Sequence, residues 1–168
     1  MRRGHGFTII ILAALLLSPA SAQPVGTRSL YGLDEVGVLV ADLHPDAERR
    51  GAERAKLQAD VERRLQQAGI HVLTEDQWKA APGKPLLYLN VGVEPLGSLP
   101  VYSVSIRLQL RQPACLARNL ILCETAVTWE DVSATRILSV SRLSSLRDEI
   151  HAVVDRFIDA CRKENARP

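Results

Sequence analysis

Residues 102–112 read YSVSIRLQLRQ, and the alternation in this stretch decides what kind of fold the chain adopts. Apolar side chains occupy every second position from Tyr102 to Leu110, and polar side chains fill the positions between them. Successive side chains of a β-strand point to opposite faces of the sheet. The stretch therefore predicts a strand with one buried face and one face in contact with water.

Further strands are expected on both sides of this segment, at residues 35–42, 70–73, 86–94, 120–129 and 136–140. The stretch 35–42 is almost continuously apolar, which is typical of a central strand that is covered on both faces. Residues 120–129 are expected to form a hairpin with the alternating strand.

Two amphipathic helices are predicted. The first opens at Pro45 in the sequence His44-Pro45-Asp46, runs to about Ala68 and ends at Gly69, which favours a left-handed cap. The second begins at Ser145 as its cap. Their apolar stripes are Leu57, Val61, Leu65 and Ala68 in the first, and Leu146, Ile150, Val153, Val154, Phe157 and Cys161 in the second.

A shorter helix is expected after Thr74, because Thr74 and Gln77 have the spacing of a capping box, and this turn carries Trp78. Each long helix has a single apolar stripe, so it can cover one face of a sheet. We therefore expect an α+β two-layer sandwich: a mixed, mainly antiparallel sheet of about five strands with both long helices on one face, in the order β-α-β-β-β-β-α.

The N-terminus has the organisation of a secretory signal peptide. Arg2 and Arg3 precede an apolar run at residues 8–17 (TIIILAALLL), and Ala20-Ser21-Ala22 supplies a small-x-small cleavage site. A helix of that length spans about 15 Å, half of a ~30 Å hydrocarbon core, so it is too short to cross a bilayer. We expect cleavage after residue 22, a flexible lead-in at 23–33, a single domain at 34–165, and a periplasmic or secreted location.

Charge and composition limit the partners of the mature protein. Removal of residues 1–22 lowers Lys plus Arg from 21 to 19 against 19 Asp plus Glu, so the formal net charge falls from +2 to zero. No basic surface is indicated, which argues against nucleic acid as a partner. No second long apolar run follows, so no transmembrane span is expected in the mature chain. The sequence does not indicate an oligomeric state.

Three cysteines are present. Cys115 and Cys123 flank Asn119, a residue that favours turns, and a hairpin there would place the two thiols opposite each other as a disulfide. The alternative is that Pro113 bulges the strand and keeps the two thiols apart. Cys161 is expected to act as a small hydrophobic residue on its helix.

Residues that bear chemistry are few. Asp42, His44 and Asp46 follow the first strand and could hold a divalent cation, or His44 could act as an acid or base. The alternative is that Asp42 ends the strand while His44 or Asp46 caps the helix. The chain shows no nucleophile elbow, phosphate loop or zinc-protease motif, and so no catalytic residue or cofactor is assigned.

The polar face of the sheet is the remaining candidate site. Alternation places Tyr88 and Asn90 on it from one strand and Arg107, Gln109 and Arg111 from the next. If the pairing of Cys115 with Cys123 continues unbroken, Trp129 lies opposite Gln109 on the same face, whereas a bulge would turn Trp129 into the core. Aromatic and arginine side chains are frequent in binding hot spots. The alternative is an ordinary solvated sheet face.

The β-α-β start, the helix exit at Ala68-Gly69-Ile70 and the later strands resemble small envelope domains, such as the N-terminal domain of TolB or the periplasmic domain of the curli secretion protein. This resemblance implies a fold and transfers no functional residue. We therefore expect a non-catalytic exported module that binds another envelope or extracellular protein. The alternative is a small hydrolase or metal-dependent enzyme centred on His44 and Asp42.

Overall fold

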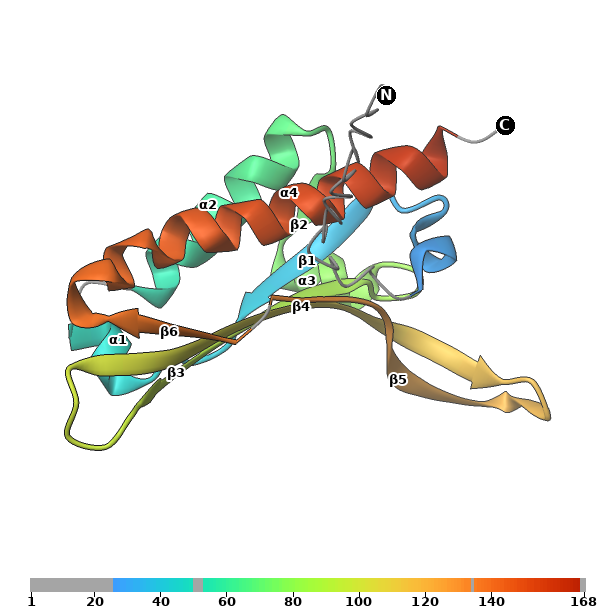
Figure 1. The fold of residues 1–168 in the computed structure, drawn as a ribbon. Coiled ribbons are helices and arrows are strands. Elements are labelled where there is room, and N and C mark those ends of the chain that lie inside the picture. Colours follow the sequence, from blue (N-terminus) through green and yellow to red (C-terminus); the bar gives the residue numbers. More distant parts are fainter. Residues whose placement is uncertain (1–25, 50–52, 134, 167–168) are drawn as a thin grey trace, which may run out of the picture.

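The computed structural model describes residues 26–49, 53–133 and 135–166, so the predicted signal peptide lies outside the described residues. Its two layers are a mixed sheet and, across one face of it, the helices α2 and α4 (Figure 1). The strands are β1 (Glu35–Val40), β2 (His71–Leu73), β3 (Leu86–Pro95), β4 (Val101–Leu116), β5 (Asn119–Val132) and β6 (Arg136–Ser139). The helical elements are η1 (Thr27–Leu30), α1 (Pro45–Arg49), α2 (Arg54–Gln67), α3 (Glu75–Ala80), η2 (Val140–Ser145) and α4 (Leu146–Asn165).

The strand order is β2-β1-β3-β4-β5, with β6 also paired to β4. The strand β1 is parallel to both β2 and β3, and the remaining pairs are antiparallel. The strand β4 pairs with β6 near its start and with β5 over the rest of its length. Ser133 lies between β5 and β6, and both its amide and its hydroxyl form hydrogen bonds with the backbone of Ile106 in β4. The predicted fold class is confirmed.

The alternation in β4 is confirmed. Its apolar residues from Tyr102 to Leu110 are 0–6% exposed and lie under the helices. The predicted helical stripes face the same core. Leu57, Val61 and Leu65 of α2 are buried, Ala68 is partly buried, and every predicted stripe residue of α4 is buried. The C-terminal cap of α2 is also as expected, with Gly69 at φ 87° and the amide of Ile70 bonded to the carbonyl of Leu65 at 3.0 Å.

The first helix differs from the prediction of one continuous helix to Ala68. The chain forms two helices, α1 and α2, because Glu53 before α2 has an extended backbone (φ −89°, ψ 120°). Ser145 also differs from its predicted role. It occupies the position before α4, but its hydroxyl donates to the carbonyl of Arg142 at 2.7 Å, so it closes η2 and does not cap α4.

Trp129 lies in the core, so its placement on the polar face with the other candidate residues was wrong. The register pairs Arg111 with Val127 and Leu110 with Trp129, which makes Thr128 an extra residue on β5. This β-bulge reverses the orientation of every later residue of β5. Trp129 is consequently 1% exposed, and its ring contacts Phe157 of α4 edge-on at 5.0 Å. Pro113, where the sequence suggested a bulge, pairs in register with Thr125.

The sequence predicted that the domain starts at Asp34, but the packed core already includes residues before it. Leu30 of η1 is 0% exposed and belongs to the core. Asn165 at the end of α4 accepts from the amide of Gly32 at 2.7 Å and donates to the carbonyl of Leu30 at 3.0 Å. These contacts join the expected lead-in, from residue 26 onwards, to the last turn of α4.

The short helix α3 covers part of the opposite sheet face. Its predicted capping box between Thr74 and Gln77 is present. The ring of Trp78 lies against Gly37 of β1, where a Cβ would stand 2.9 Å from the indole, and its Nε1 donates to the carbonyl of Lys84 at 2.9 Å. The expectation that β1 is covered on both faces therefore holds at Gly37, whereas Leu39 is 37% exposed.

Gly26 and Gly32 form a matched test of the contact between η1 and the bulge. Both have positive φ (83° and 73°), but a Cβ on Gly26 would overlap the carbonyl oxygen of Thr128, whereas a Cβ on Gly32 would meet nothing within 4 Å. Gly32→Ala should cost only the backbone strain, about 1 kcal/mol, and Gly26→Ala roughly 1–3 kcal/mol more. Denaturant unfolding of both variants measures the difference. Equal losses would contradict the close approach of Gly26 to the bulge.

Candidate functional site on the outer sheet face

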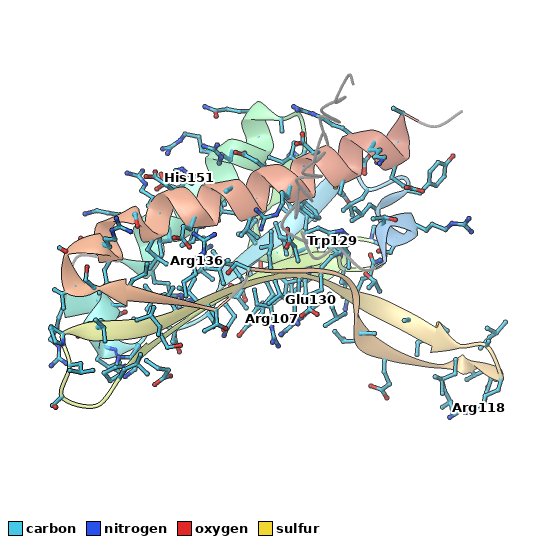
Figure 2. The ribbon with its side chains drawn as sticks, viewed as in Figure 1. Arg107, Arg118, Trp129, Glu130, Arg136 and His151 are labelled. Carbon is cyan, nitrogen blue, oxygen red and sulfur yellow. A yellow bond between two sulfur atoms is a disulfide. The ribbon has the colours of Figure 1, made fainter. Side chains whose placement is uncertain are left out.

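The candidate site lies on the sheet face opposite α2 and α4, here called the outer face. Figure 2 shows Arg107 and Glu130 on this side of the sheet and Trp129 between the sheet and α4. The register explains the grouping, because Tyr88 pairs with Gln109, Asn90 with Arg107, and Gln109 with Glu130. Of the six predicted site residues, five therefore share the face and Trp129 does not.

These side chains form a connected network. The Arg111 guanidinium lies 3.6 Å above the centre of the Tyr88 ring and donates to Gln109 Oε1 from Nε (3.0 Å) and Nη2 (2.6 Å). The Gln109 amide nitrogen donates to Glu130 Oε1 at 2.7 Å, and Arg107 Nε lies 3.5 Å from the same oxygen. The Gln109 amide thus links the Arg111 guanidinium to the Glu130 carboxylate, which Arg107 approaches directly.

Gln109 is 7% exposed, so it is not a surface contact residue as the sequence suggested. It is a positioning residue, because both ends of its amide are bonded to charged neighbours whose side chains lie above it. Arg107, by contrast, has 56% of its side chain exposed. The network therefore holds the Arg111 guanidinium in place through two hydrogen bonds, whereas Arg107 has only its longer ion pair with Glu130.

Glu130 is the site residue that sequence reasoning missed. Under the uninterrupted register, Trp129 would occupy the position opposite Gln109, and Glu130 would point into the core. The bulge at Thr128 exchanges the two residues. A signal was available in the sequence, since a core position for Glu130 would leave a carboxylate buried while a tryptophan faced water.

Of the Asp42, His44 and Asp46 candidate for a metal site, the structure describes the side chains of Asp42 and His44. Asp42 has 93% of its side chain exposed and pairs with Arg54 at 2.9 Å. The side chain of Asp46 lies outside the described part of the structure. No group of three His, Cys, Asp or Glu side chains that could hold a metal ion occurs in the described residues.

The cysteines behave as expected. Cys115 and Cys123 form a disulfide between directly paired positions of β4 and β5. The turn itself is at residues 117–118, whereas the sequence centred it on Asn119. Cys161 is 3% exposed within the core, and burial raises the pKa of its thiol to about 12, which disfavours the reactive thiolate at neutral pH.

A second polar cluster lies between α2 and α4 and serves to join the helices. Asp60, 5% exposed, is bonded by Arg63 and by Arg147 of α4, and Arg64 donates to Asp155 of α4 through both Nε (2.9 Å) and Nη2 (2.7 Å). Asp60 and Arg64 are four residues apart on α2, a spacing that allows an ion pair within one helix. Arg64 instead bridges to α4, and its hydrogen bonds hold the pKa of Asp155 below its usual value.

Comparison with known proteins gives only distant similarity. No family model matches the chain, and no curated protein matches it. Among solved structures, the PelC dodecamer from Paraburkholderia phytofirmans is 20% identical with a TM-score of 0.44, over 73% of this chain and 87% of that chain. A minor lipoprotein from Acinetobacter baumannii is 12% identical with a TM-score of 0.26, over 79% of this chain and 93% of that chain.

Gln109 and Asn90 test whether the network is a built structure. Gln109→Ala would leave Arg111 and Glu130 without their shared partner, so it should lower the free energy of unfolding by about 1–3 kcal/mol. Asn90→Ala, an exposed residue of the same face, should change it by less than about 0.5 kcal/mol. Chemical denaturation of the two variants distinguishes them. A Gln109→Ala variant as stable as the parent protein would contradict the network.

His151 should make stability depend on pH below about 6.5, the ordinary pKa of a histidine. Burial, together with Arg64 and Arg147, lowers the pKa of His151 from 6.5, and its Nε2 is buried without a hydrogen-bond partner. The unfolded chain therefore takes up a proton first as the pH falls, and the free energy of unfolding should decrease below about pH 6.5. His151→Gln should flatten this slope, whereas the exposed His71→Gln should retain it. Unfolding curves across the range measure both, and an unchanged slope in His151→Gln would contradict the assignment.

Proposed function

We propose that this protein is an exported, non-catalytic module that binds another envelope or extracellular protein through its outer sheet face. The observation that carries the proposal is the hydrogen-bonded network of Gln109, Arg111 and Glu130 beside Tyr88, with Arg107 in an ion pair at its edge. Arginine side chains next to an aromatic ring are a typical composition for a protein-binding hot spot.

Export is supported by two separate features. The charged start, apolar run and small-x-small site of residues 1–22 have the order of a cleaved signal peptide. The disulfide between Cys115 and Cys123 belongs to the chemistry of oxidising compartments. No helix of the described residues is long and apolar enough to cross a membrane.

The network also suggests what the partner presents. Glu130 accepts from Gln109 and faces Arg107, so the network carries two cations, Arg107 and Arg111, against one anion. A partner surface with one or more carboxylates beside an apolar contact would complement the excess positive charge and the adjoining Val127 and Val132, which are 46% and 39% exposed. Electrostatic complementarity of this kind adds mainly to specificity and association rate.

The test begins with cross-linking and capture of partners from the native host's envelope, followed by affinity measurement with the purified partner. Arg107→Ala should weaken the complex about ten-fold or more, because Arg107 is the exposed arginine of the network. It should leave the melting temperature nearly unchanged, since its own ion pair is exposed and long.

Two matched variants keep this test specific. Arg162→Ala changes an exposed arginine of α4 on the other side of the sheet and should leave affinity unchanged. His44→Ala should also leave it unchanged, whereas the enzyme alternative requires that variant to abolish an activity. Equal affinity losses for Arg107→Ala and Arg162→Ala would overturn the assignment of the outer face.

A further inference from the structure

The end of the β4–β5 hairpin is an exposed apolar surface that the outer-face proposal does not use. Residues 116–122 are here called the hairpin tip. Ile121 is 91% exposed, Leu120 73%, Leu122 51% and Leu116 37%. The hairpin projects past the layer of helices, so the tip stands away from the core at one end of the molecule (Figure 1). Such a concentration of exposed apolar side chains is uncommon on a soluble domain and indicates contact with another apolar phase.

The strand register explains why these side chains are exposed. Leu116 pairs with Asn119 and the next pair is Cys115 with Cys123, so residues 120–122 have no partner on β4 in this register. The side chain of Asn119 accepts from the amide of Ile121 at 3.2 Å, and the disulfide closes the base of the tip. The disulfide therefore closes the tip into a loop, and the course of the backbone in this loop leaves its apolar side chains exposed.

The directions of these side chains distinguish between kinds of partner. Successive residues of an extended chain point to different sides, and residues 120, 121 and 122 are all more than half exposed. A flat protein surface or a groove on a second copy would cover one side of the tip and leave the other in water. A fluid apolar medium surrounds all of them.

The charge of the tip indicates more closely which kind of apolar partner it contacts. Between Arg111 and Glu124 the chain has one charged residue, Arg118, which lies in the turn at residues 117–118. An apolar segment that carries a cation and no carboxylate suits the boundary between acyl chains and anionic headgroups, since the long arginine side chain can reach a phosphate while neighbouring residues enter the apolar region.

We propose that the hairpin tip inserts into the outer part of an anionic lipid bilayer and holds the module at a membrane surface. From Cys115 the β4 arm reaches the turn at residues 117–118 within two to three residues, roughly 7–10 Å, which matches the about 5–10 Å depth of interfacial insertion. The outer face is the side of the sheet opposite the helices, and it lies away from the tip. A membrane-bound molecule can therefore still bind a protein partner there. The disulfide keeps the tip as one hairpin during insertion.

The test is flotation with vesicles of phosphatidylethanolamine and phosphatidylglycerol, using protein exported by the expression host. Mass spectrometry first verifies that residues 1–22 are absent, so that the apolar run at 8–17 cannot bind lipid. The parent protein should float with the vesicles. Ile121→Ser should lower the vesicle partition constant by about ten-fold or more, because the serine variant no longer gains free energy from moving an exposed isoleucine into the apolar phase. Arg118→Gln should reduce binding to these vesicles but not to neutral phosphatidylcholine vesicles.

Ile137→Ser is the matched control. Ile137 of β6 is 69% exposed, and the same substitution there should leave vesicle binding unchanged. The proposal is overturned if the parent protein does not float, or if both serine variants lose binding equally. It is also overturned if sedimentation shows an oligomer that Ile121→Ser dissociates, because the tip is then covered by a second copy. Failure of the outer-face experiment would leave these results unaffected, since Arg107 takes no part in them.

Discussion

The single extra residue at Thr128 in β5 is the constraint on which both faces of this sheet depend. It turns Trp129 toward α4 and sends Glu130 to the outer face, and it leaves Asp131 on the core side, where Arg156 of α4 bonds it at 2.6 Å. Burying a tryptophan removes about 150–250 Å² from water, on the order of 4–6 kcal/mol, whereas a lost ladder hydrogen bond costs roughly 1 kcal/mol. The free-energy cost of the bulge is further offset by a hydrogen bond that Ser29 donates to the Thr128 carbonyl at 2.8 Å. The core therefore determines the register, and the register determines the composition of the outer face.

The same strand pair joins the two surfaces for which a role is proposed. Over the sheet, β4 and β5 supply the arginines and the carboxylate of the network, and beyond the sheet they continue to the apolar tip. The disulfide lies between these two regions. The outer face is polar and bonded within itself, as suits reversible recognition in water. The tip is apolar and has few partners of its own. The two proposed roles, protein binding and lipid binding, would therefore belong to one pair of strands.

Most of the fold could be predicted because its signals are local and repeated. The alternation in β4, the stripes of α2 and α4, the capping box at Thr74 and the left-handed cap at Gly69 each depend on residues within a few positions of one another. The predictions that failed depend on distant contacts. The docking of Leu30 and the burial of Trp129 against Phe157 involve partners that the local pattern does not name. The candidate site shows the same difference. Alternation predicted its residues on β3 and β4, but it did not predict Glu130 on β5.

By itself, the sequence determined the order of the elements, the face on which β4 is buried and the pairing of Cys115 with Cys123, because periodicity and short hairpin geometry act over neighbouring residues. Only the tertiary structure decided that Trp129 is core and Glu130 is surface. A shift of one residue in register exchanges the two faces of a strand, and the periodicity of β5 alone does not locate the extra residue. The choice was made by Phe157 of α4, Ser29 of η1 and Leu110 of β4, which come together only when the helix, the N-terminal turn and the sheet are packed.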